Sequence, residues 1–82
     1  MYVVADDAVR EAVAALPAEL LPAMAELRTA LELAPWSVGT PLVPSNPRGL
    51  RVVGFGERER AQLVYGVVDR DRLVSLLQLS WV

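Results

Sequence analysis

The sequence predicts a small α+β protein in which two helices pack on one face of a four-stranded, mainly antiparallel sheet. Three observations lead to this expectation: a short β-rich start, a middle part with helical periodicity, and a final third with the pattern of three strands. The element order is therefore strand, helix, helix, strand, strand, strand, which is typical of a two-layer sandwich. A chain of 82 residues is expected to form one domain, spanning residues 1–82.

The first strand, at residues 2–5, is expected to run directly into a helix. Asp6 and Asp7 end the β-rich start, and either aspartate can cap a helix. Apolar side chains then recur along one helical face, at Val9, Ala12, Val13 and Leu16. Pro17 ends this helix, because proline has no backbone N–H to continue the hydrogen-bond pattern.

A second helix is expected to begin at Ala18 or nearer Leu21, and to stop before Pro35. Its apolar stripe comprises Leu20, Met24, Leu27 and Leu31. Residues 35–49 hold four of the six prolines, and this composition predicts a loop. A loop of this length in a small fold serves a function or covers a core, and we expect core cover.

Three strands joined by charged turns are expected in the last third, at residues 50–55, 61–69 and 73–82. Gly66 is expected to mark a β-bulge or a close contact. The last strand has apolar residues on both faces, which predicts a central position that is covered on both sides.

The composition excludes several classes of function. The chain has no cysteine and no histidine, so we expect no disulfide, no zinc site and no serine–histidine hydrolase. No cofactor is expected. No apolar run reaches the roughly 20 residues that cross a bilayer. The first ten residues lack a signal-peptide pattern, so a cytoplasmic protein without membrane contact is expected.

The basic residues are concentrated in the second half. Residues 1–34 hold six acidic residues and two arginines, whereas residues 48–72 hold four acidic residues and six arginines. The net charge of −2 disfavours tight autonomous binding to RNA or DNA. The candidate RNA-binding residues are nevertheless arginines whose guanidinium groups can grip phosphates: Arg48, Arg51, Arg58 and Arg60.

The alternative for the turn arginines is ion pairing at the surface. Arg58 and Arg60 can pair with Glu57 and Glu59, and the arginines near residue 70 can pair with the aspartates beside them. Arg48 and Arg51 have no acidic residue beside them in the sequence. For these two, a phosphate contact and a structural role remain equally open.

Three aromatic residues have candidate roles. Tyr65 can act as an acid or stack on a base, although an aromatic residue inside a strand more often packs in the core. Trp36 can pin the proline-rich loop onto the domain or bind a partner. Trp81 can be a core residue or part of an apolar patch that receives a partner.

Taken in order, the segments of the chain resemble the RelE/ParE toxin superfamily over nearly their whole length. The similar segments are Ala15-Leu16-Pro17, Gly49-Leu50-Arg51-Val52, Gln62 to Asp69, and Leu73 to Trp81. Pro35-Trp36 and Trp81 are similar to short actinobacterial members. The resemblance implies the toxin of a bacterial type II toxin–antitoxin pair. One branch of that superfamily cuts mRNA in the ribosomal A site, and the other inhibits DNA gyrase by protein contact.

Compared with the mRNA-cutting branch, the chain departs from the family pattern at several positions. Arg51 matches a basic position of the family, but Val53 and Gln62 stand where basic residues are expected, and no late arginine follows Trp81. We therefore expect weak or no ribonuclease activity, and a toxin that acts by binding and is held in check by an antitoxin peptide. The alternatives are a metal-independent mRNA endonuclease that uses Arg48, Arg51 and Tyr65, and a non-toxic interaction module that forms a homodimer.

Overall fold

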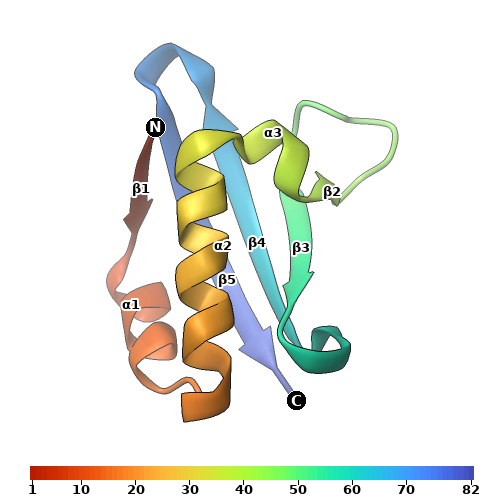
Figure 1. Cartoon of the computed structure of the whole chain (residues 1–82). Coiled ribbons are helices and arrows are strands. Elements are labelled where there is room, and N and C mark those ends of the chain that lie inside the picture. The colour runs from red at the N-terminus through yellow and green to blue at the C-terminus, as the bar shows by residue number, and fades with distance from the viewer.

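Helix α2 (Leu21–Leu33) crosses one face of a five-stranded sheet in the computed structural model, which describes residues 1–82 (Figure 1). The α+β class agrees with the prediction. The strands are β1 (Tyr2–Ala5), β2 (Thr40–Pro41), β3 (Arg51–Phe55), β4 (Ala61–Val68) and β5 (Leu73–Trp81), in the spatial order β1-β5-β4-β3-β2. The other helices are α1 (Asp7–Ala14) and α3 (Pro35–Val38), and short 3-10 turns are η1 (Ala18–Leu20), η2 (Glu57–Glu59) and η3 (Asp69–Asp71).

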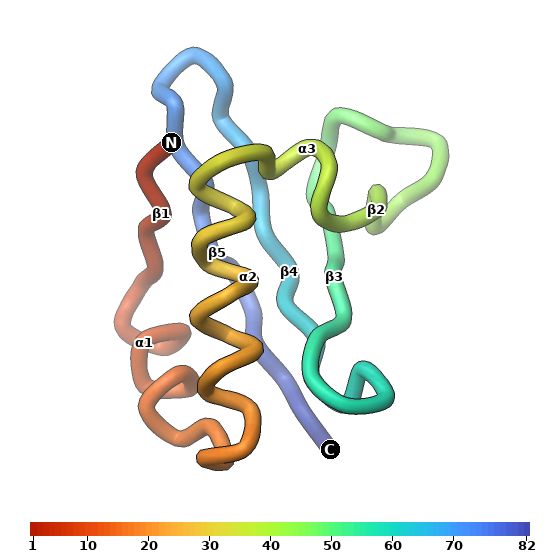
Figure 2. Tube along the Cα trace, viewed as in Figure 1, coloured from red at the N-terminus to blue at the C-terminus, as the bar shows by residue number.

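The prediction of four strands is wrong, because the sheet has five, whereas most strand pairs are antiparallel as expected. Residues 35–49 were expected to be only a loop, but they contain helix α3 and strand β2, which adds to the edge of β3. Strand β1 pairs with β5 in parallel, and the other three pairs are antiparallel. The chain path explains the parallel pair. Helix α2 returns the chain to the end where β1 began, so β3 and, two hairpins later, β5 run in the direction of β1 (Figure 2).

The predicted helix boundaries are close to the observed ones. Asp6 caps α1, and its carboxylate accepts a hydrogen bond from the Val9 backbone N–H at 2.9 Å. The first helix ends at Ala14, ahead of Pro17, and η1 leads into α2 at Leu21. Pro22 is accommodated in the first turn of α2, where a missing N–H costs nothing. No helix of the chain is long and apolar enough to span a bilayer.

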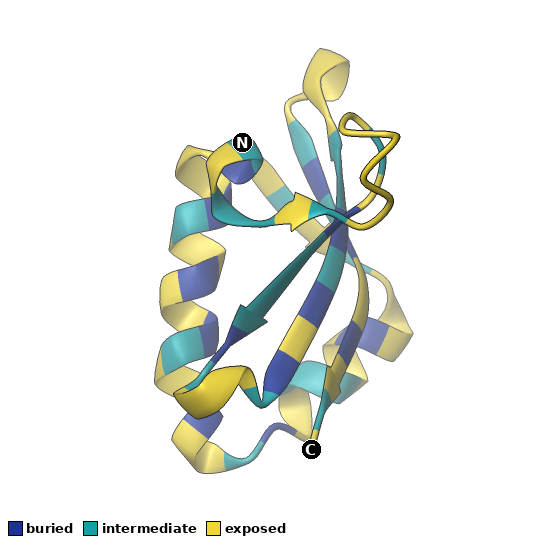
Figure 3. Cartoon of the chain, turned by 90° about the vertical axis from the view of Figure 1, so that its right-hand side faces the viewer, coloured by how far each residue is buried: buried dark blue, intermediate teal, exposed yellow.

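One core of apolar side chains lies between the sheet and the helices. It comprises Val9, Leu16, Leu20, Met24, Leu27, Leu31, Phe55, Ala61, Leu63, Tyr65, Val74, Leu76 and Leu79. Buried residues recur every three or four positions along α2 and every second position along β4, as Figure 3 shows. Helices α1 and α2 and the three long strands therefore contribute to the same core.

The β-bulge lies just before Gly66. Val64 pairs with Gln78 and Tyr65 with Leu76, so Leu77 of β5 is an extra residue, whereas Gly66 pairs regularly with Ser75. The extra residue changes which side chains of β5 point inward. Val74 and Leu76 face the core before the bulge, and Leu79 faces it afterwards. Simple alternation cannot describe the whole of β5, because the buried residues Leu76 and Leu79 are three positions apart.

The face of the sheet away from the core is exposed and apolar, contrary to the expectation that β5 is covered on both sides. We call it the open sheet face and define it by Tyr2, Val4, Leu50, Val68 and Leu77, which are 77%, 41%, 45%, 38% and 43% exposed. Side chains of Leu50 and Leu77 lie within about 4 Å of the position that a Cβ atom on Gly66 would take. The apolar surface is therefore continuous across β4 and β5.

Candidate functional site

Four of the residues singled out in the sequence meet where residues 35–49 join the sheet. Together with an aspartate from η3 they form a cluster that we call the polar anchor, defined by Trp36, Arg48, Arg51, Tyr65 and Asp69. They come from α3, from the loop before β3, from β3 and β4 themselves, and from the turn after β4. Residues far apart in the chain thus converge at the end of the sheet where β3 begins.

Arg51 is the only charged residue in the buried set, with 6% of its surface exposed. It shares the inward face of β3 with Val53 and Phe55, because alternate residues of a strand point to the same side. Its guanidinium group donates to the backbone carbonyl oxygens of Gly39 at 2.6 Å, Trp36 at 3.1 Å and Pro47 at 3.3 Å. Arg51 therefore ties three points of residues 35–49 to the sheet.

Tyr65 holds the same segment through its hydroxyl group and is completely buried. The hydroxyl donates to the Pro35 carbonyl oxygen at 2.8 Å and accepts from the Gly39 backbone N–H at 3.0 Å. A Cβ atom on Gly39 would come within 2.5 Å of the Val52 carbonyl oxygen, so only glycine allows this close approach. The donor and an acceptor position of Tyr65 are thus both used inside the protein.

The exposed part of the polar anchor centres on Asp69. Its carboxylate accepts from the indole Nε1 of Trp36 at 2.8 Å and from Arg48 at 3.0 Å. The guanidinium carbons of Arg48 and Arg51 lie 5.3 Å and 5.2 Å from the centre of the Trp36 ring, within the range of cation–π attraction. Only Arg48, whose side chain is 78% exposed, presents a cation to solvent here, and a carboxylate already pairs with it.

The other two candidate RNA-binding arginines lie beyond the opposite end of β3. Arg60 pairs with Glu19 at 3.0 Å and donates to the Val82 carbonyl oxygen at 3.0 Å, so the predicted pairing with its neighbouring glutamates is wrong. Arg58 makes no ion pair and has a positive φ of 57°. Because this turn is separated from the polar anchor by the length of β3, the four arginines do not form one surface (Figure 1).

The Arg60 contact has an electrostatic consequence for Glu19. The pKa of the Glu19 carboxyl is lowered from its ordinary value, first by a backbone hydrogen bond and then by the hydrogen bond and the charge of Arg60. The side chain of Glu19 is 64% exposed, so its contact with Arg60 connects η1 to the turn before β4 at the protein surface.

The two tryptophans do not form a common partner site. Trp36 belongs to the polar anchor, whereas Trp81 ends β5 opposite Ala61, at the other end of the sheet. Trp81 is half-buried and packs against the core. No cluster of acidic side chains is placed to hold a metal ion.

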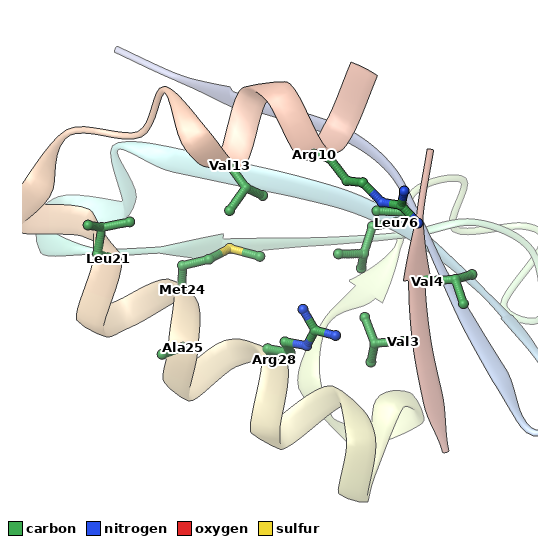
Figure 4. A pocket seen from close by; sticks show the side chains of 10 residues that line it. Val3, Val4, Arg10, Val13, Leu21, Met24, Ala25, Arg28 and Leu76 are labelled. Carbon is green, nitrogen blue, oxygen red and sulfur yellow. The ribbon is translucent and has the colours of Figure 1, made fainter. Parts of the chain in front are cut away.

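A cleft that the sequence reasoning missed opens between β1, α1 and α2 (Figure 4). It has a volume of about 420 Å³, and its walls are apolar except for Arg10 and Arg28. The signal in the sequence was present but weak: these are the only two basic residues in the acidic first half.

Comparison of the chain with protein-family models, with curated proteins and with solved structures finds no match.

Proposed function

We propose that this chain is the toxin-like member of a type II toxin–antitoxin pair and that it acts by binding a protein target, not by cutting RNA. The observation that carries the proposal is the open sheet face. Five large apolar side chains lie exposed there without a covering helix. Exposed apolar patches of this kind are typical of protein–protein contact sites.

The polar anchor supports binding over catalysis. Metal-free RNA cleavage needs a base for the 2′-hydroxyl, charge stabilisation of the phosphorane and an acid for the leaving oxygen. The hydroxyl of Tyr65 and the guanidinium of Arg51 are committed to backbone groups, and Arg48 is paired with Asp69. An mRNA endonuclease that uses Arg48, Arg51 and Tyr65 would have to break these contacts first.

The order of elements also supports the proposal. A strand, two helices and a meander of three strands follow one another as the resemblance to RelE/ParE toxins implies, with the short elements α3 and β2 as additions. The partners that fit the proposal are a cognate antitoxin peptide and a protein target such as DNA gyrase. Self-association through the open sheet face would instead favour a homodimeric, non-toxic module.

Induced expression in a bacterial host tests this function. We expect growth arrest, relief of the arrest by the product of the adjacent small reading frame, and co-purification of the two proteins. Absence of arrest would contradict a toxin. Cleavage of a reporter mRNA on ribosomes by substoichiometric amounts of the purified protein would contradict binding as the mode of action and would favour the endonuclease.

A further inference from the structure

The cleft between β1, α1 and α2 has the build of a small-molecule site. Its volume of about 420 Å³ lies within the range of about 300–1,000 Å³ that is usual for ligand pockets. Val3 and Ala5 of β1, Met24 of α2 and Leu76 of β5 form apolar walls. Such pockets typically combine apolar walls with a few polar groups that orient the ligand.

The polar groups of this cleft are all cationic. Arg10 reaches in from α1 and Arg28 from α2, and Figure 4 shows both side chains directed toward β1. No acidic side chain lines the cleft. An uncharged ligand would form no ion pair with the two arginines, and a cationic ligand would be repelled by them.

Both guanidinium groups are available to a ligand. Arg10 faces Asp7 at 3.7 Å and Arg28 faces Glu32 at 3.5 Å, each on its own helix. The four side chains are 46–95% exposed, and pairs that are this long and this exposed contribute little. A carboxylate placed between the two helices could therefore accept hydrogen bonds from both arginines at small cost.

We propose that this cleft binds a small aliphatic carboxylate, with the hydrocarbon chain along the walls of β1 and α2 and the carboxylate at Arg10 and Arg28. A carboxylate carries one charge and loses less hydration than a phosphate on entering an apolar cleft, which favours it among anions. This inference depends on the cleft alone, so its failure would leave the proposed toxin function untouched.

The binding test uses decanoate, titrated below its micelle concentration into the full-length protein and followed by NMR. We expect saturable shifts of the methyl signals of Val3, Met24 and Leu76. Decanol should bind about tenfold more weakly, and decylamine and acetate should not bind measurably. Equal binding of decanoate, decanol and decylamine, or shifts centred on Leu77 of the open sheet face, would overturn the proposal.

Paired variants separate charge from shape. The double substitution Arg10→Gln and Arg28→Gln should lower the affinity for decanoate roughly five- to thirtyfold. The control, Arg70→Gln with Arg72→Gln, changes the net charge equally outside the cleft and should leave the affinity unchanged.

A second pair of variants tests the apolar walls. Ala25→Phe fills the cleft from an exposed position of α2 and should abolish binding, whereas Ala14→Phe on α1, outside the cleft, should not. Circular dichroism checks that each variant is folded. Unchanged affinity in both the double arginine variant and Ala25→Phe would refute the site.

Discussion

Two pairs of arginines in this small protein are used in opposite ways. Arg48 and Arg51 belong to the polar anchor, where carbonyl oxygens, the Trp36 ring and Asp69 engage their guanidinium groups. Arg10 and Arg28 border the cleft and have only long, exposed ion pairs. Two of the four candidate RNA-binding arginines thus make contacts that hold residues 35–49, whereas the two arginines for which the sequence predicted no role have only weak ion pairs. The contrast teaches that an arginine without an acidic residue beside it in the sequence can serve to hold a loop by donating to backbone carbonyl oxygens.

The largest effect is expected at Arg51. Arg51→Met keeps an unbranched apolar stem but removes the guanidinium group, so the carbonyl oxygens of Trp36, Gly39 and Pro47 lose their donor. We expect a loss of roughly 2–4 kcal/mol in the free energy of unfolding, measured by urea denaturation. Arg70→Met, at an exposed position, serves as the control and should change it by less than about 0.5 kcal/mol. A loss below about 1 kcal/mol for Arg51→Met would show that the hydrogen bonds of Arg51 to residues 35–49 contribute little to stability.

Tyr65→Phe removes a single oxygen atom and tests the hydrogen bonds through which the Tyr65 hydroxyl holds Pro35 and Gly39. The Pro35 carbonyl and the Gly39 N–H would lose their buried partner, so we expect a loss of about 1–3 kcal/mol. Tyr2→Phe removes the same atom from a side chain that is 77% exposed and should have no measurable effect. Equal stability of the two variants would contradict the role assigned to the Tyr65 hydroxyl.

The exposed ion pair of the polar anchor should contribute much less. A double-mutant cycle with Arg48→Gln and Asp69→Asn is expected to give a coupling energy of about 0.2–1 kcal/mol that decreases with added salt. A coupling above about 2 kcal/mol that is insensitive to salt would place this pair with the buried contacts instead.

Glu19 provides a test by pH. Its pKa is lowered in the folded protein, so its contribution to stability is present above the ordinary value of 4.5 and is lost as the pH falls through the folded pKa. Arg60→Gln should raise the pKa of Glu19 only part of the way back, since the backbone hydrogen bond is the larger cause. NMR titration of the Glu19 carboxyl carbon measures this, and a complete return to the ordinary value would assign the whole effect to Arg60.

Local patterns predicted most of the elements but not their arrangement. The cap at Asp6, the prolines at 17 and 35 and the valine-rich segments set the boundaries of α1, α2 and the three long strands. The parallel pairing of β1 depends on the path of the whole chain, which no local pattern contains. A bulge was expected at Gly66 of β4, but the extra residue is Leu77 on the neighbouring strand β5, and no glycine marks that position.

The sequence singled out four residues of the polar anchor, and for two of them the observed role was among the stated alternatives: Trp36 pins the proline-rich segment to the domain, and Tyr65 packs in the core. These four residues do lie together, but a sequence does not show the carbonyl oxygens that accept from Arg51 and Tyr65, or the Asp69 carboxylate that accepts from the other two. One signal was available: alternation along β3 places Arg51 on the same face as Val53 and Phe55, and therefore in the core. The cleft was missed because it is formed by three separate elements.

Growth arrest by two variants of the full chain tests most directly whether the protein acts by binding through the open sheet face. Leu77→Asp places a charge on the open sheet face, and Arg48→Ala removes the exposed cation of the polar anchor. With both proteins shown to be folded, we expect Leu77→Asp to abolish the arrest and Arg48→Ala to retain it. Arrest that survives Leu77→Asp and disappears with Arg48→Ala would contradict binding through the open sheet face. It would favour the endonuclease that uses the arginines of the polar anchor.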